Sequence, residues 1–118
     1  VHGGTVHQPT AHVVLTDGDG KVEAEADGNG MVDAAIAAIA QATGISGTLL
    51  DFKVSSVTGG GDALGDVVAL LEADGHKASG RGVATDIVEA SARAYLSAVN
   101  KIVRLQARNE KRERVVGP

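Results

Sequence analysis

Cysteine and tryptophan do not occur in this 118-residue sequence, and phenylalanine and tyrosine occur once each. The lack of cysteine excludes disulfide bonds, thiolate nucleophiles and zinc–thiolate sites, and it fits the cytoplasmic location that we expect. With aromatic residues at 2% of the chain, the core must be built from alanine, valine, isoleucine and leucine. Such a core is typical of closely packed helices and sheets rather than of a roomy aromatic pocket.

Basic residues are outnumbered by acidic ones, and the net charge of −4 disfavours nucleic acid as a partner of the whole domain. No apolar run approaches the roughly 20 residues needed to span a bilayer, and no signal-peptide pattern is present. We therefore expect neither a nucleic-acid nor a membrane partner. The length fits one domain that buries roughly 65% of its unfolded surface.

Side chains for metal or nucleophilic chemistry are also scarce. The four histidines lie at positions 2, 7, 12 and 76, and the five-residue spacing of the first three suits neither a helical ligand pair nor a structural zinc site. Neither a G-x-S-x-G sequence nor a phosphate-loop pattern is present. We expect no catalytic residue, metal site or cofactor in this chain.

The order of apolar residues and turn signals predicts a mixture of strands and helices. Strands are expected over 11–16, 21–27, 48–58, 66–74 and 76–82, with a turn at 17–20 and a loop at 59–65. Helices are expected over 31–42, with Gly44 as the stop signal, and from Asp86 onward. Asp86 and Glu89 have the spacing of a capping box.

The stretches 1–42 and 66–99 repeat one plan of strand, turn, strand, glycine pair and helix. The aligned positions are Asp19–Gly20 with Asp74–Gly75, and Gly28 and Gly30 with Gly80 and Gly82. The repeat predicts an α+β fold of two pseudo-symmetric strand–strand–helix units, which share a sheet with both helices on one face.

Three aspartates, Asp33, Asp62 and Asp86, border glycine-rich turns and admit two interpretations. In the structural one, they cap a helix, favour a helix start or form a turn. In the functional one, they receive the ammonium of a small zwitterion whose carboxylate binds helix-start N–H groups. The apolar wall of such a site would come from Leu49, Phe52 and Ala63.

Six of the eleven basic residues follow Asn100, at Lys101, Arg104, Arg108, Lys111, Arg112 and Arg114. One interpretation is a solvated helix end that complements the negative end of the helix dipole. A surface that docks onto another domain is the alternative, and a nucleic-acid site is the least favoured.

A resemblance to a known family is carried by GNGMVDAAIAAI (28–39), LLDFKVSSVTGGGDALGDV (49–67) and TDIVEASARAYLSAVNKI (85–102). In order and spacing these segments resemble the C-terminal regulatory domain of 2-isopropylmalate synthase. Citramalate synthases carry a similar domain. The resemblance runs from about His12 to Ile102 and so covers most of the chain.

The resemblance implies a homodimeric regulatory domain that binds an end product at the dimer interface and mediates feedback inhibition of leucine biosynthesis. The effector would be leucine, or isoleucine if the parent were a citramalate synthase. The parent would be an acyltransferase whose TIM barrel, joined in cis, condenses acetyl-CoA with 2-ketoisovalerate on a divalent metal. That barrel is absent here, so we expect this chain not to be catalytic.

By the same resemblance, residues 1–10 are a linker from the catalytic domain, 11–107 the effector-binding domain and 108–118 a basic tail. The implied effector contacts are Asn29, Gly30, Val32, Asp33, Leu49, Phe52, Ser56, Asp62, Ala63, Gly65, Val83, Ala84 and Thr85. The sequence departs from the family at Met31, where proline is common, and at Phe52, where tyrosine is frequent. Both departures bear on the identity and affinity of the effector.

Two other classes of function stay open at this point. One is a free-standing small-molecule sensor with no barrel partner. The other is an enzyme that uses Asp33 or Asp86 as a base, which the scarcity of catalytic side chains disfavours.

Overall fold

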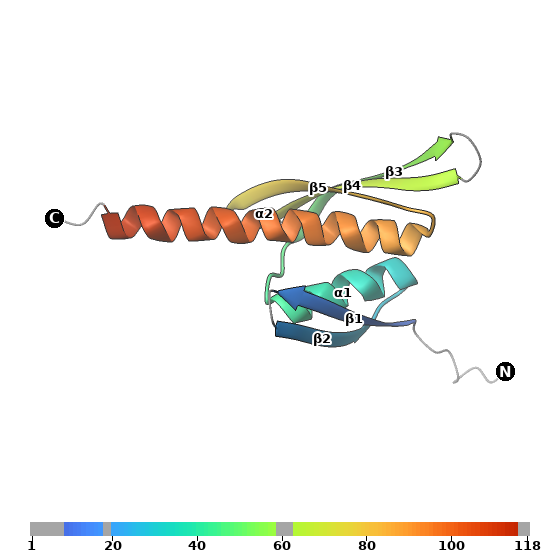
Figure 1. The fold of residues 1–118 in the computed structure, drawn as a ribbon, viewed down its shortest axis with the longest axis horizontal. Helices are drawn as coiled ribbons and strands as arrows, with labels where there is room; N and C mark the ends of the chain where they lie inside the picture. The colour runs from blue at the N-terminus through green and yellow to red at the C-terminus, as the bar shows by residue number, and fades with distance from the viewer. Residues whose placement is uncertain (1–8, 18–19, 59–62, 116–118) are drawn as a thin grey trace. The chain divides into compact units, whose positions relative to one another are not determined.

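The structure is a computed structural model that describes residues 9–17, 20–58 and 63–115. It divides into two compact units, residues 1–44 and 45–118, and each contains strands followed by a helix (Figure 1). Parts of four expected segments lie outside the described residues. They are residues 1–8 of the linker, 18–19 of the turn, 59–62 of the loop and 116–118 of the tail.

The first unit consists of an antiparallel hairpin and one helix, β1 (Thr10–Asp17), β2 (Gly20–Asp27) and α1 (Met31–Thr43). The helix buries an apolar face of three alanines and one isoleucine, Ala34, Ala35, Ala38 and Ile39, which follow helical spacing. It ends at Gly44, whose φ of 73° is left-handed and whose N–H donates to the Ala40 carbonyl at 2.9 Å.

Gly28 explains how the helix can start so close to the hairpin. A Cβ atom at this position would lie 2.4 Å from the backbone nitrogen of Ala34 and 2.8 Å from the carbonyl carbon of Asp33. Its own N–H donates to the Pro9 carbonyl at 3.0 Å. Only glycine permits this approach of two backbone segments.

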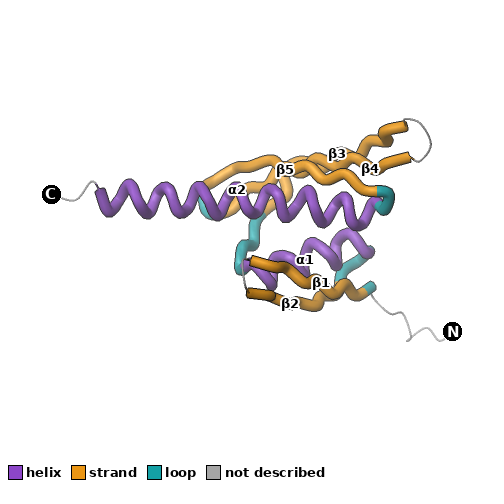
Figure 2. Tube along the Cα trace, in the orientation of Figure 1, coloured by secondary structure: helices purple, strands orange, loops and turns teal. Residues whose placement is uncertain are grey.

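The second unit is a three-stranded antiparallel sheet with one long helix (Figure 2). Its elements are β3 (Thr48–Thr58), β4 (Ala63–Ala73), β5 (His76–Ala84) and α2 (Ile87–Val115), with strand order β3-β4-β5. Asp74 and Gly75 join β4 to β5 with φ values of 53° and 81°. Two successive positive φ angles are what a tight two-residue hairpin turn requires.

Helix α2 lies against β5 and β4 and forms the core of this unit with them. Val67, Leu71, Val99 and Ile102 are fully buried. Gly80 and Gly82 permit the contact, since Cβ atoms there would lie 2.2 Å and 2.1 Å from backbone oxygens of α2. The helix therefore packs directly on the backbone of β5.

The α+β class and the strand–strand–helix units are confirmed, with corrections to the detail. The described strands form two sheets, of two and three strands, rather than one shared sheet, and β3 precedes the second repeat. Gly80 and Gly82 lie within β5, as the strand expected over 76–82 requires, and this strand continues to Ala84. β4 begins at Ala63, so residues 63–65 belong to a strand and not to the loop expected over 59–65.

The start of α2 is capped by Asp86, whose Oδ1 accepts a hydrogen bond from the Val88 N–H at 2.7 Å. Glu89 does not complete the expected capping box but pairs with Arg93 one turn later, at 2.8 Å. Helix α2 continues to Val115, so no helix end marks the tail boundary expected at 107/108.

Replacing Gly82 with alanine is expected to destabilise the second unit by about 3 kcal/mol, because the new methyl group overlaps backbone atoms that cannot rotate away. Chemical unfolding of both proteins checks this. Gly30→Ala is the control, since no atom lies within 4 Å of the added Cβ, and it should cost less than about 1 kcal/mol. Equal losses in the two variants would contradict the packing argument.

Candidate functional site

The start of α1 is a helix N-terminus without a capping side chain. Gly30 occupies the cap position in an extended conformation, with φ −154°, and no side-chain oxygen accepts from the first-turn N–H groups. Such N–H groups point along the helix axis at its positive end and readily bind a carboxylate or another anion. The glycine-rich turn therefore offers an anion site.

A carboxylate lies beside these N–H groups. Asp33 is exposed in the first turn and makes no hydrogen bond or ion pair with the described residues, while its neighbour Val32 is half-buried. Asn29 is exposed just before the cap. Four of the predicted site residues thus form one short segment that carries anion-binding N–H groups, a free carboxylate and an apolar side chain.

A second group of predicted residues meets in the three-stranded sheet. Ser56, Gly65 and Ala84 are register partners across β3, β4 and β5, so they form one row. A Cβ atom at Gly65 would lie 3.0 Å from Cδ1 of Ile87, the first residue of α2. The row therefore lies at the end of the sheet where α2 begins.

The other predicted residues of this unit lie around that row or away from it. Val83 is half-buried and pairs with Asp66 on the opposite face of the sheet, and Thr85 is exposed directly after β5. Ala63 is the first residue of β4. Asp62 lies outside the described residues.

Leu49 and Phe52 are not gathered with the row. Leu49 is seven positions before Ser56 on β3, which at strand rise is about 20 Å away. Phe52 is half-buried and packs against a cluster of five core residues, Val67, Ala69, Ala84, Ala90 and Ala94. Its ring contributes to the core of the second unit.

Sequence reasoning missed one ion pair near the row. Arg81 donates from Nε to Oδ1 of Asp66 at 2.9 Å and from Nη2 to Oδ2 at 2.6 Å. These hydrogen bonds and the positive charge lower the pKa of Asp66, although partial burial opposes the shift. The turn at 74–75 sets the register of β4 and β5, and this register places the two side chains diagonally opposite each other. The ion pair could therefore have been predicted from the position of the turn in the sequence.

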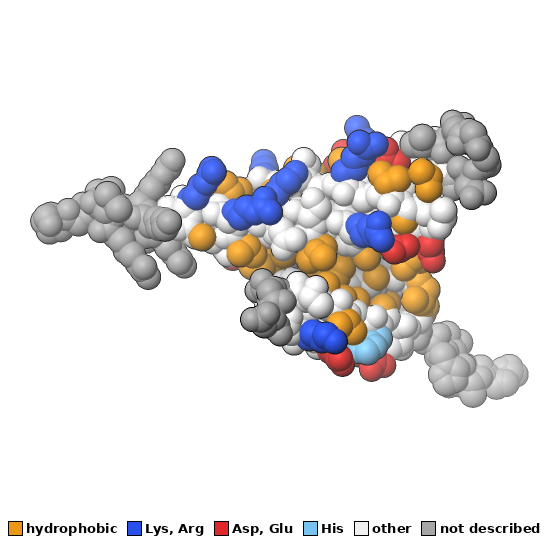
Figure 3. Space-filling model, viewed as in Figure 1, with side chains coloured by type: hydrophobic (Ala, Val, Ile, Leu, Met, Phe, Trp, Pro, Cys, Tyr) orange, Lys and Arg blue, Asp and Glu red, His pale blue; other side chains and the backbone are white. Residues whose placement is uncertain are grey.

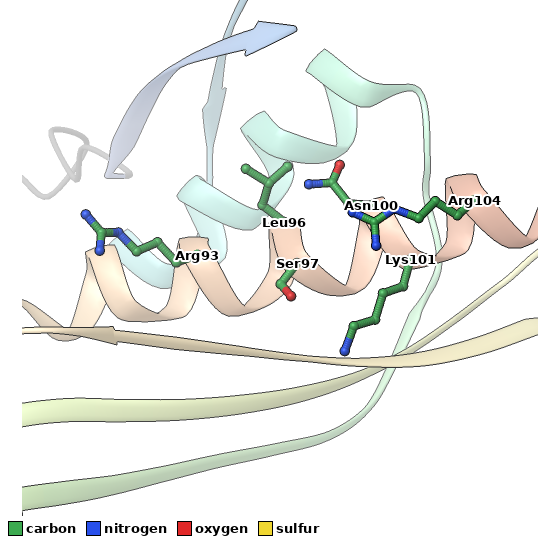
Figure 4. Close-up of a pocket in the computed structure, with 6 residues that line it drawn as sticks. All are labelled: Arg93, Leu96, Ser97, Asn100, Lys101 and Arg104. Atoms are coloured by element: carbon green, nitrogen blue, oxygen red, sulfur yellow. The ribbon is translucent and has the colours of Figure 1, made fainter.

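Two hollows on the second unit involve none of the predicted site residues. One is lined by α2 alone, with Arg93, Leu96, Ser97, Asn100, Lys101 and Arg104 (Figure 4). The other lies between α2 and β5. Both are lined by basic side chains and no carboxylate.

A metal centre and a membrane-spanning helix are two further kinds of site to consider in the part of the chain that the structure describes. That part contains no group of three or more His, Asp or Glu side chains that could hold a metal ion. No helix in it combines the length and the apolar character that crossing a membrane would need.

The sequence model of a known family, described as the LeuA allosteric (dimerisation) domain, matches residues 1–103. The chain belongs to this family. The matched part of this LeuA domain contains all thirteen predicted effector residues, whereas Arg104 and the rest of α2 lie beyond it.

Proteins named 2-isopropylmalate synthase are similar to this LeuA domain. The one from Acidimicrobium ferrooxidans is 51% identical over 114 residues, which are 96% of this chain and 22% of that protein. The one from Pyrococcus furiosus is 52% identical over 91 residues, 77% of this chain and 18% of that protein. The one from Geobacillus kaustophilus is 40% identical over 119 residues, which are 100% of this chain and 23% of that protein. The chain thus spans about a fifth of the length of these relatives.

Replacing Arg81 with glutamine is expected to raise the pKa of Asp66 toward its ordinary value, because the two hydrogen bonds and the charge are lost. A carboxylate with a lowered folded-state pKa stabilises the fold above about pH 4, and that contribution is lost as the pH falls through the folded-state pKa. NMR titration of the carboxyl carbon measures the shift.

Urea unfolding measures the linked stability. The wild type should exceed Arg81→Gln at about pH 7, and the difference should shrink toward pH 2. Lys53→Gln, which removes an exposed cation on β3, serves as the control. A stability difference between wild type and Arg81→Gln that stays constant over this range would refute the assigned role of the ion pair.

Proposed function

We propose that this chain is the regulatory part of a 2-isopropylmalate synthase, which binds leucine and mediates feedback inhibition of leucine biosynthesis. The observation that carries the proposal is the start of α1. Uncapped helix N–H groups and the free carboxylate of Asp33 lie within one turn of each other. They are the two complements that the carboxylate and the ammonium of an amino acid require.

Leucine would bind with its carboxylate at the N–H groups of the α1 start and its ammonium at Asp33. Val32 offers a half-buried apolar side chain in this segment. The predicted contacts of the second unit, with the row of Ser56, Gly65 and Ala84 among them, stay in the proposal as residues that complete the site in the assembled protein. Phe52 lacks the hydroxyl that a tyrosine would offer there.

The proposal includes a homodimer, and an uncovered part of the β3 surface supports it. Leu49 and Val54 are register partners of the fully buried Leu71 and Val67, so they share the face of the sheet on which α2 packs. Because α2 lies against β4 and β5, Leu49 and Val54 remain 37% and 53% exposed. Apolar side chains left open beside a core are typical of an interaction surface.

Regulation would follow from the linkage of binding to a change of state. A ligand shifts an equilibrium only by its differential affinity for the two states, typically about 1–3 kcal/mol. In the whole enzyme these two states would differ in the activity of a catalytic barrel that carries a divalent metal. A cytoplasmic location, as expected for such an enzyme, belongs to the same proposal.

Isothermal titration of the chain with leucine tests the proposal, and its mass in solution is measured beside it. Asp33→Asn is expected to weaken leucine binding roughly tenfold or more, because a charge-assisted contact to the ammonium is lost. Glu25→Gln, which removes an exposed carboxylate of the same unit, should change the affinity less than about twofold.

Each outcome has a defined meaning. Preference for leucine over isoleucine supports the assignment, although moving one methyl group is worth only about 1–3 kcal/mol. Preference for isoleucine would instead assign the chain to a citramalate synthase. A folded dimer that binds neither amino acid refutes the effector site.

The proposed dimer surface is tested separately. Val54→Asp is expected to weaken dimerisation roughly tenfold or more, because an unpaired charge would be buried in the interface. Val68→Asp is the matched control, since Val68 is 40% exposed but lies on the opposite face of the same sheet. Sedimentation equilibrium measures both. Loss of the dimer in the control alone would assign the interface to the opposite face.

A further inference from the structure

A strip of basic side chains runs along α2 and the adjoining part of β5. We define this basic strip as Lys77, Arg93, Lys101, Arg104 and Arg108. Lys and Arg side chains gather over this helix and the sheet beside it in the space-filling view (Figure 3). The strip lines two hollows of about 250 and 320 Å³, which share Lys101 and Arg104. The larger one is completed by Ala78, Ser79 and Leu105.

The positive charge of the basic strip is only partly neutralised by the described residues. Lys77 and Arg93 each have one carboxylate partner. Lys101 donates to a backbone carbonyl of β5. Arg104 and Arg108 make no hydrogen bond or ion pair with the part of the chain that the structure describes. An excess of positive charge thus lies on one surface of a chain whose net charge is −4.

The basic strip is elongated, and its side chains do not converge on one point. Arg93 and Arg108 are fifteen residues apart on α2, which at helical rise is about 22 Å. An extended peptide of about seven residues spans that length. Figure 4 shows Leu96 and Asn100 on one side of α2 and Lys101 on the side of the sheet, so these side chains do not surround one centre.

Other polyanions fit this surface less well. No aromatic residue lines either hollow, so nucleotide bases would have no stacking platform. A compact anion such as phosphate would reach only part of the strip, because Arg93 and Arg108 lie about 22 Å apart along α2. Carboxylates spaced along a chain avoid both difficulties.

We propose that the basic strip binds an extended acidic segment of another polypeptide. Spaced glutamate or aspartate side chains would pair with Lys101, Arg104 and Arg108, while Leu105 and Ala78 contact the aliphatic parts of the segment. Arg104 and Arg108 lie beyond the family match, which ends at residue 103. No residue of the strip belongs to the leucine site, so the proposal does not depend on leucine binding.

The probe for the test is a fluorescein-labelled oligoglutamate peptide of about eight residues. Its affinity is measured by anisotropy at about 50 mM and 300 mM salt, and screening should weaken binding at the higher concentration. The double variant Arg104→Glu with Arg108→Glu is expected to weaken binding roughly tenfold or more, because attraction becomes repulsion.

The matched control is Lys21→Glu with Lys53→Glu, which changes the net charge by the same amount at exposed positions outside the strip. It should weaken binding less than about twofold. Equal losses in both double variants would overturn the proposal, since the peptide would then respond to net charge alone. Tighter binding of tripolyphosphate or of a single-stranded oligonucleotide of equal charge would also overturn it.

Circular dichroism verifies that α2 is retained in each variant. If the glutamate pair fails to fold, Arg104→Gln with Arg108→Gln replaces it, because it removes the two positive charges without adding negative ones. That pair should still reduce the affinity for oligoglutamate and its dependence on salt. An unchanged salt dependence would exclude the strip as the binding surface.

Discussion

The backbone contact between β5 and α2 is the constraint on which the second unit depends. Gly80 and Gly82 lack side chains where Ala90, Ala94 and Ala98 approach, so the helix axis lies closer to the sheet than larger residues would allow. A core with so few aromatic side chains must gain its dispersion energy from close approach rather than from large contact areas. Gly28 permits a similarly close backbone approach in the first unit, where the hairpin meets α1.

Much of this fold could be predicted from the sequence, because local signals and tertiary structure agree. The Asp74–Gly75 turn and the Gly44 stop signal predict elements that the structure contains. The shared sheet was wrong, since strand pairing between distant segments leaves no local signal. The close approach of α2 to Gly80 and Gly82 was missed for a related reason, because a sequence does not show which glycine of a strand admits a neighbouring helix.

The candidate site could be predicted in part. The segment around Gly30 and Asp33 is contiguous, so its chemistry follows from the helix start itself. The row of Ser56, Gly65 and Ala84 depends on the register of three strands, which no local pattern of the sequence determines. These three residues were predicted from the family resemblance alone. Phe52 illustrates the limit, because a residue expected at the effector also packs in the core.

The Lys101 contact with Ser79 has a consequence for how copies of this sheet can join. Strands β3 and β5 form the two edges of the sheet. The ammonium of Lys101 donates a hydrogen bond to the Ser79 carbonyl of β5. A lysine at an edge discourages the addition of further strands. Growth of a sheet into a fibre requires two receptive edges, whereas one receptive edge permits only a closed pair. Lys101 thereby makes β5 less open to a further strand at Ser79.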